Sequence, residues 1–184
     1  LHLAAHQRQD RARHQLMADP PVDVTVSTDG LDSLVRAIRA EEDGKDLRKE
    51  LAKNLREALK PAAAAAKSGI RAMPADGSGR ASPALRPTIA AKIRPEVKLG
   101  GRWTGARVKA FKTPTLRRFP NAPKRTQKAT WRTRTFGRDE WREQKGKPGW
   151  FDDPMHADKA AYIRAVHEAM EAMAARLASR TRST

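Results

Sequence analysis

The 184-residue sequence contains no cysteine, and only 5% of its residues are aromatic. Without cysteine there is no disulfide framework, no thiolate nucleophile and no cysteine-ligated zinc site. Large apolar side chains are also scarce: leucine, isoleucine, valine and phenylalanine supply 29 residues, whereas alanine alone supplies 32. Alanine favours helix but buries little area. With a formal net charge of +17, this composition predicts a small core and long solvated segments.

The sequence also lacks a long apolar run. No stretch approaches the roughly 18 apolar residues that cross a bilayer. The first residues do not show the charged region followed by an apolar region that is typical of a secretory signal. We therefore expect neither an integral membrane protein nor a secreted one.

Patterns that carry catalysis or metal binding are absent as well. His2 and His6 have the spacing of a helical metal pair, but no third ligand accompanies them. His156 and His167 have no nearby serine or carboxylate in an arrangement that activates a nucleophile. No phosphate-binding loop, nucleophile elbow or dinucleotide fingerprint is present. We expect no enzymatic activity, no cofactor, no metal site and no small-molecule substrate.

Positive charge is concentrated in the middle of the sequence. Residues 85–148 contain 19 basic and 4 acidic residues, against 14 and 12 in residues 1–84 and 5 and 5 in residues 149–184. Aromatic residues, which often anchor interfaces together with arginine, are interleaved with this charge: Trp103, Phe111, Phe119, Trp131, Phe136, Trp141 and Trp150. The pattern favours an interaction with a polyanion or an acidic protein surface. The alternative is a solvated arm that only keeps the protein soluble.

Periodicity in the N-terminal half predicts one strand followed by helices. Alternating valines predict a strand over residues 22–26. Apolar residues at helical spacing over residues 31–38 predict a helix that Thr28 or Asp29 caps. A second stripe, Leu47 to Leu59, predicts the most regular helix of the chain. Pro61 is expected to bend it, and the alanine run that follows continues it to about residue 72.

The middle of the chain predicts a connection, a hairpin and an arm. Glycine, serine and proline make residues 74–87 a flexible connection. Alternation over residues 89–99, a turn at Gly100-Gly101 and a returning strand over 106–111 predict a basic hairpin, with Pro95 at an edge or a bulge. Residues 112–147 are expected to form an extended basic arm that contains a strand from Trp131 to Phe136.

The C-terminal segment predicts an amphipathic helix. Asp153 is the expected N-cap, with Pro154 at the first helical position, and the apolar stripe runs from Tyr162 to Leu177. Taken together, the predicted elements are helices at both ends of the chain and a small hairpin between them. Residues 1–16 are expected to be a tail or leader before a single domain over residues 17–184.

These elements resemble the tail-component family of long-tailed bacteriophages, which comprises tail-completion and head–tail joining proteins. The resemblance covers residues 22–99 and 148–178. It is carried by a strand before Gly30-Leu31-Asp32-Ser33-Leu34, a long helix ending in Ile70-Arg71-Ala72-Met73-Pro74, and Pro148-Gly149-Trp150-Phe151 before the last helix. Gly79, Leu85 and Ile89 follow the first helix with wider spacing than in the family. The arm is an addition to the family's minimal pattern.

The resemblance implies an α+β fold, in which a small antiparallel sheet packs against the long N-terminal helix and the C-terminal helix. It also implies a structural subunit that assembles as a homo-oligomeric ring, expected to have six copies, in the neck of the virion. The partners implied are neck proteins on the portal, adaptor or stopper side and on the tail-tube side, with genome DNA passing through the lumen and assembly in the host cytoplasm. A chain with a small core gains burial from neighbouring copies. The residues expected to contact a partner are Arg117, Arg118, Lys124, Arg125, Trp131, Arg132, Arg134, Trp141, Trp150 and Phe151.

The alternative function is that of a basic nucleic-acid-binding protein. An isoelectric point near 11.0 and a basic hairpin with aromatic residues favour it. However, the sequence shows neither a recognition helix nor an aromatic RNA-binding sheet, and its most regular helices are nearly balanced in charge. Salt separates the two functions, because affinity for DNA falls by orders of magnitude between about 50 and 200 mM salt, whereas a protein ring with an aromatic interface persists.

Overall fold

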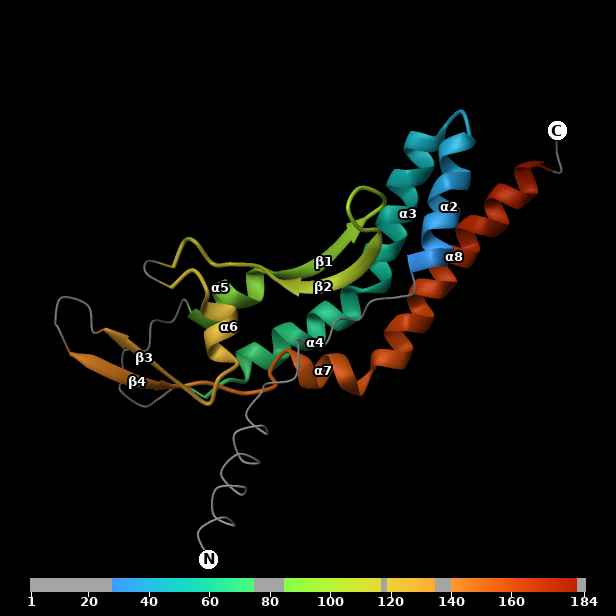
Figure 1. Cartoon of the computed structure of the whole chain (residues 1–184). Helices are drawn as coiled ribbons and strands as arrows, with labels where there is room; N and C mark the ends of the chain where they lie inside the picture. The colour runs from blue at the N-terminus through green and yellow to red at the C-terminus, as the bar shows by residue number, and fades with distance from the viewer. Residues whose placement is uncertain (1–27, 75–84, 117–118, 135–139, 182–184) are drawn as a thin grey trace, which may run out of the picture.

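A computed structural model describes residues 28–74, 85–116, 119–134 and 140–181 (Figure 1). These residues form helices and strands in the order α2 (Thr28–Ala40), α3 (Gly44–Ala58), α4 (Lys60–Arg71), α5 (Leu85–Ala91), β1 (Ile93–Lys98), β2 (Gly105–Ala110), α6 (Ala122–Thr126), β3 (Thr130–Arg134), β4 (Trp141–Lys145), α7 (Asp152–Ala157) and α8 (Lys159–Thr181). The α+β class predicted from the sequence is confirmed. The predicted tail over residues 1–16 and strand over residues 22–26 lie outside the described residues, as does most of the predicted connection over residues 74–87.

Three N-terminal helices follow the predicted pattern. The apolar stripes of α2 and α3 are buried, and Leu51, Leu55 and Leu59 are fully enclosed. The bend expected at Pro61 is a helix boundary, because α3 ends at Ala58 and α4 begins at Lys60. Pro61 therefore stands in the first turn of α4, where a missing N–H leaves no hydrogen bond unmade. The alanine run packs its buried positions, Ala62, Ala63 and Ala66, into the core.

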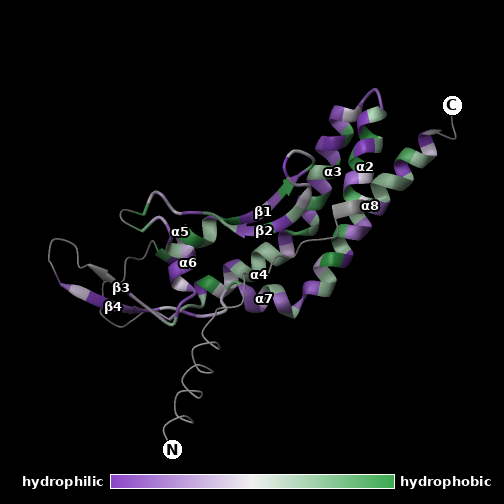
Figure 2. Cartoon of the chain, in the orientation of Figure 1, coloured by the Kyte–Doolittle hydropathy of each residue, from purple (hydrophilic) through white to green (hydrophobic). Residues whose placement is uncertain are grey.

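Helix α3 lies between two layers (Figure 1). The β1–β2 hairpin packs against α3 and α4 on one side, and α2 and α8 pack against α3 on the other. Figure 2 shows hydrophobic and hydrophilic residues interleaved along these helices. The core is made of leucine, isoleucine, methionine and alanine side chains from all these elements.

The predicted small sheet is two separate antiparallel hairpins. In the first, Ile93 of β1 pairs with Ala110 of β2 and Lys98 pairs with Gly105. The predicted turn is confirmed, since Gly100 and Gly101 both have positive φ angles, 114° and 95°. Helix α8 packs chiefly against α3 and α2, whereas β1 and β2 pack chiefly against α3, α4 and α5.

Residues 85–91 form helix α5, so the strand predicted to start at residue 89 is wrong over its first part. Ile89, Ala90 and Ile93 are all at most 1% exposed. The neighbouring residues Ile89 and Ala90 both face the core from α5, whereas successive side chains of an extended segment point to opposite sides. Alternation was misleading here because neighbouring alanines satisfy a helical and an extended pattern equally well.

The predicted C-terminal helix is divided into α7 and α8 at Asp158. Asp153 is not the N-cap: the cap is Phe151, and the backbone N–H of Asp153 already donates to the carbonyl of Gly149 at 2.9 Å. Pro154 consequently occupies the third helical position, still within the first turn. The apolar stripe of α8 is confirmed, with buried Tyr162, Val166, Met170, Met173 and Leu177.

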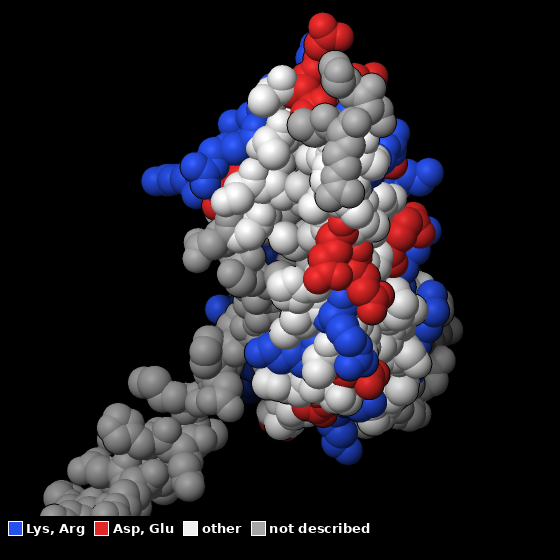
Figure 3. All heavy atoms as spheres, turned by 90° about the vertical axis from the view of Figure 1, so that its right-hand side faces the viewer, with Lys and Arg blue, Asp and Glu red and all other residues white. Residues whose placement is uncertain are grey.

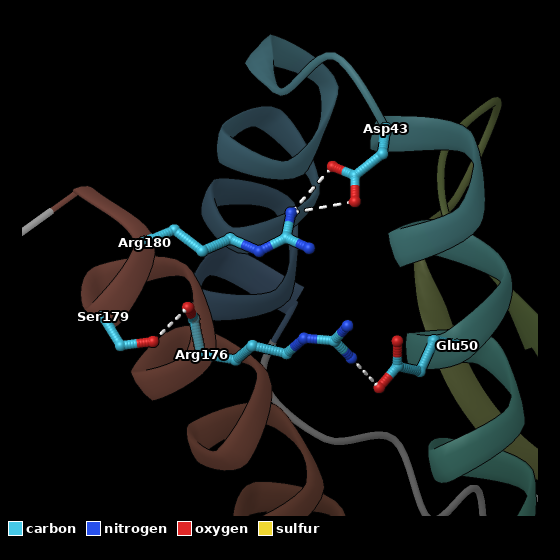
Figure 4. Close-up of polar contacts among 5 residues, drawn as sticks. All are labelled: Asp43, Glu50, Arg176, Ser179 and Arg180. Atoms are coloured by element: carbon cyan, nitrogen blue, oxygen red, sulfur yellow. Dashed lines mark hydrogen bonds and ion pairs between the residues drawn. The ribbon is translucent and has the colours of Figure 1, made fainter. Parts of the chain in front are cut away.

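Polar contacts fix the C-terminal half of α8 against α3 (Figure 4). Arg176 pairs with Glu50, and Arg180 donates to both carboxylate oxygens of Asp43 at 2.8 Å. All four side chains are partly exposed, so each pair contributes about 0.2–1 kcal/mol and chiefly sets orientation. No helix among the described residues is long and apolar enough to cross a membrane.

Candidate interaction surface

The second hairpin, β3 and β4, projects away from the helical body (Figure 1). We call it the projecting hairpin. Its strands pair from Thr130↔Lys145 to Arg134↔Trp141. The strand predicted at Trp131 is thus confirmed over residues 130–134, and β4 is its partner. Because side chains alternate along a strand and paired residues share a face, the register divides the hairpin into two faces.

The outer face of the projecting hairpin carries cations and an exposed tryptophan. Arg132 stands opposite Glu143 in the register, and Trp141 and Lys145 fall on the same face. Trp141 is 53% exposed, and all four side chains face solvent. An indole that is half exposed beside arginine and lysine is typical of an interface anchor.

The inner face attaches the hairpin to the body. Trp131 is 8% exposed, and its ring stacks on Phe119 with centroids 5.9 Å apart. The guanidinium of Arg125, on α6, lies over the ring of Phe119, 5.5 Å from its centroid. One face of the hairpin therefore packs against the chain, and the side chains of the other are exposed to solvent.

A buried polar contact holds the base of the hairpin. The indole Nε1–H of Trp150 donates to the Oγ1 of Thr126 at 3.2 Å, and this hydroxyl donates to the carbonyl of Ala122 at 2.9 Å. Trp150 is 1% exposed and Thr126 is fully buried. The backbone of Gly146 passes so close to the Lys128 carbonyl that no side chain fits there. The two ends of the hairpin are thus fixed to α6 and to the segment before α7.

A second buried threonine organises the loop that precedes α6. The backbone N–H of Thr113 donates to the Pro120 carbonyl at 2.8 Å, and its hydroxyl donates to the Phe119 carbonyl at 3.0 Å. Thr113 is fully buried. These bonds bring Phe119 to the place where it meets Trp131. The segment predicted as an extended arm is therefore ordered around α6 before the hairpin projects.

The solvent face of β1 and β2 is also basic, but its groups are paired within the chain. Arg94 and Lys109 lie over the ring of Phe111, and Arg107 and Lys98 lie over the ring of Trp103, at 4.4–5.2 Å from the centroids. Both aromatic rings are covered in this way. The carboxylate of Glu96 accepts from Arg107 at 2.7 Å and lies 3.9 Å from the Lys109 amine.

Glu96 is the one acidic group in this basic surface. Burial raises the pKa of its carboxyl, but the hydrogen bond from Arg107 and the charges of Arg107, Lys109 and Lys98 outweigh burial and lower the pKa below its ordinary value. Glu96 is therefore ionised at neutral pH and fixes the cross-strand register of β1 and β2.

The side of the molecule formed by α2 and α8 has a different character. Figure 3 shows acidic and basic side chains interspersed there, with uncharged surface between them. Glu168 and Glu171 of α8 are exposed on this side. The excess of positive charge thus belongs to the hairpins and not to the helical layer, as the distribution of charge along the sequence predicts.

The structure brings some of the predicted contact residues together and removes others from the surface. Lys124 and Arg125 on α6 and Arg132 and Trp141 on the projecting hairpin are exposed. Trp131, Trp150 and Phe151 are at most 8% exposed. The prediction that these three contact a partner directly is corrected: they form the support on which the exposed residues stand. Arg134 lies in β3 opposite Trp141, and Arg117 and Arg118 lie outside the described residues.

Sequence reasoning missed strand β4 and the two buried threonines. The segment Trp141–Lys145 has no apolar alternation, so only the alternation in β3 hinted at a partner strand. Thr113 and Thr126 have no distinctive sequence pattern, since threonine at a loop or a short helix is ordinarily exposed.

Among the described residues, no group of three or more histidine, aspartate or glutamate side chains is placed to hold a metal ion. Function must be inferred from the chain's own residues, because comparisons with protein-family models, curated proteins and solved structures give no match.

Proposed function

We propose that this protein is a structural subunit of a bacteriophage neck, which joins head to tail as a member of a homo-oligomeric ring. The observation that carries the proposal is the projecting hairpin. Its inner face is anchored through Trp131 and its outer face presents Trp141 beside basic side chains. The order of elements that resembles the tail-component family supports the assignment to the neck.

Energetics favour a partner on the outer face. A two-stranded hairpin by itself is marginally stable in water, and this one buries little beyond Trp131. Covering the exposed half of Trp141, on the order of 100 Å², is worth roughly 2–3 kcal/mol. A neighbouring protein surface supplies that burial.

A head-to-tail contact of this kind supports the proposal of a ring. The projecting hairpin and the helical layer are different surfaces of one chain. In the proposed assembly the hairpin of each copy contacts the body of the next copy, which is a heterologous contact, and heterologous contacts that close generate rings. The proposed ring has six copies, contacts neck proteins above and below, and leaves a lumen for the genome. Joining and sealing are mechanical, so no step requires catalysis.

Nucleic-acid binding is the weaker alternative. Bases stack on exposed aromatic faces in proteins that bind single strands, but Trp103 and Phe111 are covered by cations of their own chain. Trp141 is the large apolar side chain most exposed among the described residues. A basic surface with one such anchor fits an acidic protein neighbour better than a track of bases.

The proposal is tested by the mass and shape of the purified full chain at about 0.5 M salt, where the Debye length is only a few ångströms. Light scattering and negative-stain electron microscopy are expected to show a closed ring that resists this salt. A monomer at high salt that binds duplex DNA only when salt falls toward about 50 mM would contradict the proposal and favour the alternative.

A further inference from the structure

An open groove of about 330 Å³ lies between α3 and the end of β1, on the opposite part of the molecule from the projecting hairpin. Its walls are basic: Lys45, Arg48, Lys49 and Arg56 line it. Its floor is apolar and consists of Ala52, Val97 and Leu99. None of the described residues that line it is acidic. The groove therefore combines four cations with an aliphatic surface.

The cations face the groove because of their spacing along α3. Lys45, Lys49 and Arg56 are separated by four and seven residues, which places them on one side of a helix. Lys45 and Arg56 have no ion-pair partner among the described residues. The Lys49 amine donates a hydrogen bond, 2.8 Å long, to the carboxylate of Asp46. This bond and the negative charge of Asp46 raise the pKa of the amine. All three side chains are exposed.

Arg48 supplies the second observation. One guanidinium nitrogen donates to the carbonyl of Leu99 at 2.7 Å, which ties α3 to the end of β1. The Nε of the same side chain is buried and has no hydrogen-bond acceptor among the described residues. A buried charged donor without an acceptor costs free energy. A carboxylate in the groove would balance the positive charge that Arg48 and the other three cations place there.

We propose that this groove binds an acidic segment of a partner protein, with carboxylates on the cations and an aliphatic side chain on the floor. The apolar floor decides the class of ligand, because a phosphodiester backbone has no aliphatic group to place on Val97 and Leu99. Glutamate beside leucine supplies both parts. The inference does not rest on the proposed neck function, since it concerns a different surface and is measured on the chain alone.

The test is fluorescence anisotropy with the full chain at about 0.15 M salt, where exposed charges are screened beyond about 8 Å. Three labelled probes of equal net charge are compared: a peptide in which glutamate alternates with leucine, a glutamate-only peptide and a single-stranded DNA. The wild type is expected to bind the glutamate–leucine peptide most tightly of the three.

Matched variants separate the groove from general charge. Lys45→Gln, Lys49→Gln and Arg56→Gln together are expected to weaken the glutamate–leucine peptide about tenfold or more. Lys53→Gln, Lys124→Gln and Lys128→Gln remove the same charge from exposed positions outside the groove, and binding is expected to stay within about twofold. Val97→Thr is expected to weaken the glutamate–leucine peptide but not the glutamate-only peptide. Arg48 is left in place because it holds Leu99.

Thermal melting checks that every variant folds. If the triple groove variant does not fold, the single Lys45→Gln variant replaces it, because the Lys45 side chain has no ion-pair partner among the described residues. This variant is expected to bind the glutamate–leucine peptide measurably more weakly than the wild type. The inference is overturned if the wild type does not bind the peptide, if the control triple variant loses as much affinity as the groove variant, or if DNA binds more tightly through the same residues. A ring that forms without peptide binding refutes the groove and leaves the neck function standing.

Discussion

The two hairpins of this chain have the same topology and similar charge but very different surroundings. In β1–β2, Ile93 and Ala106 are at most 1% exposed because the hairpin lies on α3 and α4. In β3–β4, every β4 side chain is exposed or half-exposed, and Trp141 reaches 53%. Each has an arginine opposite a glutamate, Arg107 with Glu96 and Arg132 with Glu143.

The difference shows how one chain uses the same local structure for two purposes. Alternating apolar residues on one face make β1–β2 part of the core, and its cations are occupied by Trp103, Phe111 and Glu96. The projecting hairpin has a single buried anchor and leaves its outer face available. Burial stabilises the first, and contact with a neighbour is expected to stabilise the second.

The largest expected effect comes from removing the buried end of β1. Ile93→Ala deletes a fully enclosed side chain and is expected to lower the free energy of unfolding by about 2–5 kcal/mol. Arg132→Ala, at an exposed position of β3, is expected to change it by less than about 0.5 kcal/mol. Urea unfolding measures both. Equal effects would mean that the two hairpins do not differ in their contribution to the core.

A smaller effect is expected at the base of the projecting hairpin. Thr126→Val keeps the shape of the side chain but removes the acceptor of the Trp150 indole N–H. A buried donor left unpaired costs about 1–3 kcal/mol. Thr126→Ser, which retains the hydroxyl, is the matched control and is expected to lose less. Thermal unfolding of the two variants decides this, and a Val variant as stable as the wild type would show that the contact does not hold the hairpin.

The pH dependence of the two glutamates separates the hairpins further. The pKa of Glu96 is lowered in the folded chain. The ionised carboxylate therefore adds to the free energy of unfolding above the ordinary pKa of about 4.3–4.5, and this stabilisation is lost as the pH falls through the pKa of the folded chain. Glu96→Gln is expected to cost about 0.5–1 kcal/mol at pH 7 and less at about pH 3.

Glu143→Gln is the control for this comparison. Glu143 occupies the corresponding register position opposite Arg132 but is exposed, so its replacement is expected to change stability by less than about 0.3 kcal/mol at either pH. Thermal melting at both pH values measures the difference between the two variants. A larger loss for Glu143→Gln than for Glu96→Gln would reverse the assignment.

The helices could be predicted from the sequence because leucine residues at helical spacing fit an amphipathic helix and do not fit a strand. The β1–β2 hairpin followed from alternation around Gly100-Gly101, whereas α5 did not, because Ala90 and Ala91 fit either pattern. The prediction that differed most from the structure was the exposure of Trp131 and Trp150, which are buried. Their burial depends on Phe119 and Thr126, which are brought to them by tertiary structure, and composition alone does not distinguish a buried anchor from an exposed one.

The central claim is that the projecting hairpin joins copies of this chain. Its most direct test is the mass, by light scattering at about 0.5 M salt, of the wild type and of a variant with Trp141→Ser and Arg132→Ser. The wild type is expected to form a ring and the variant a monomer that is still folded, as judged by its circular dichroism. Arg164→Ser, an exposed change on α8, is expected to keep the ring. A hairpin variant with the mass of the wild type would contradict the account.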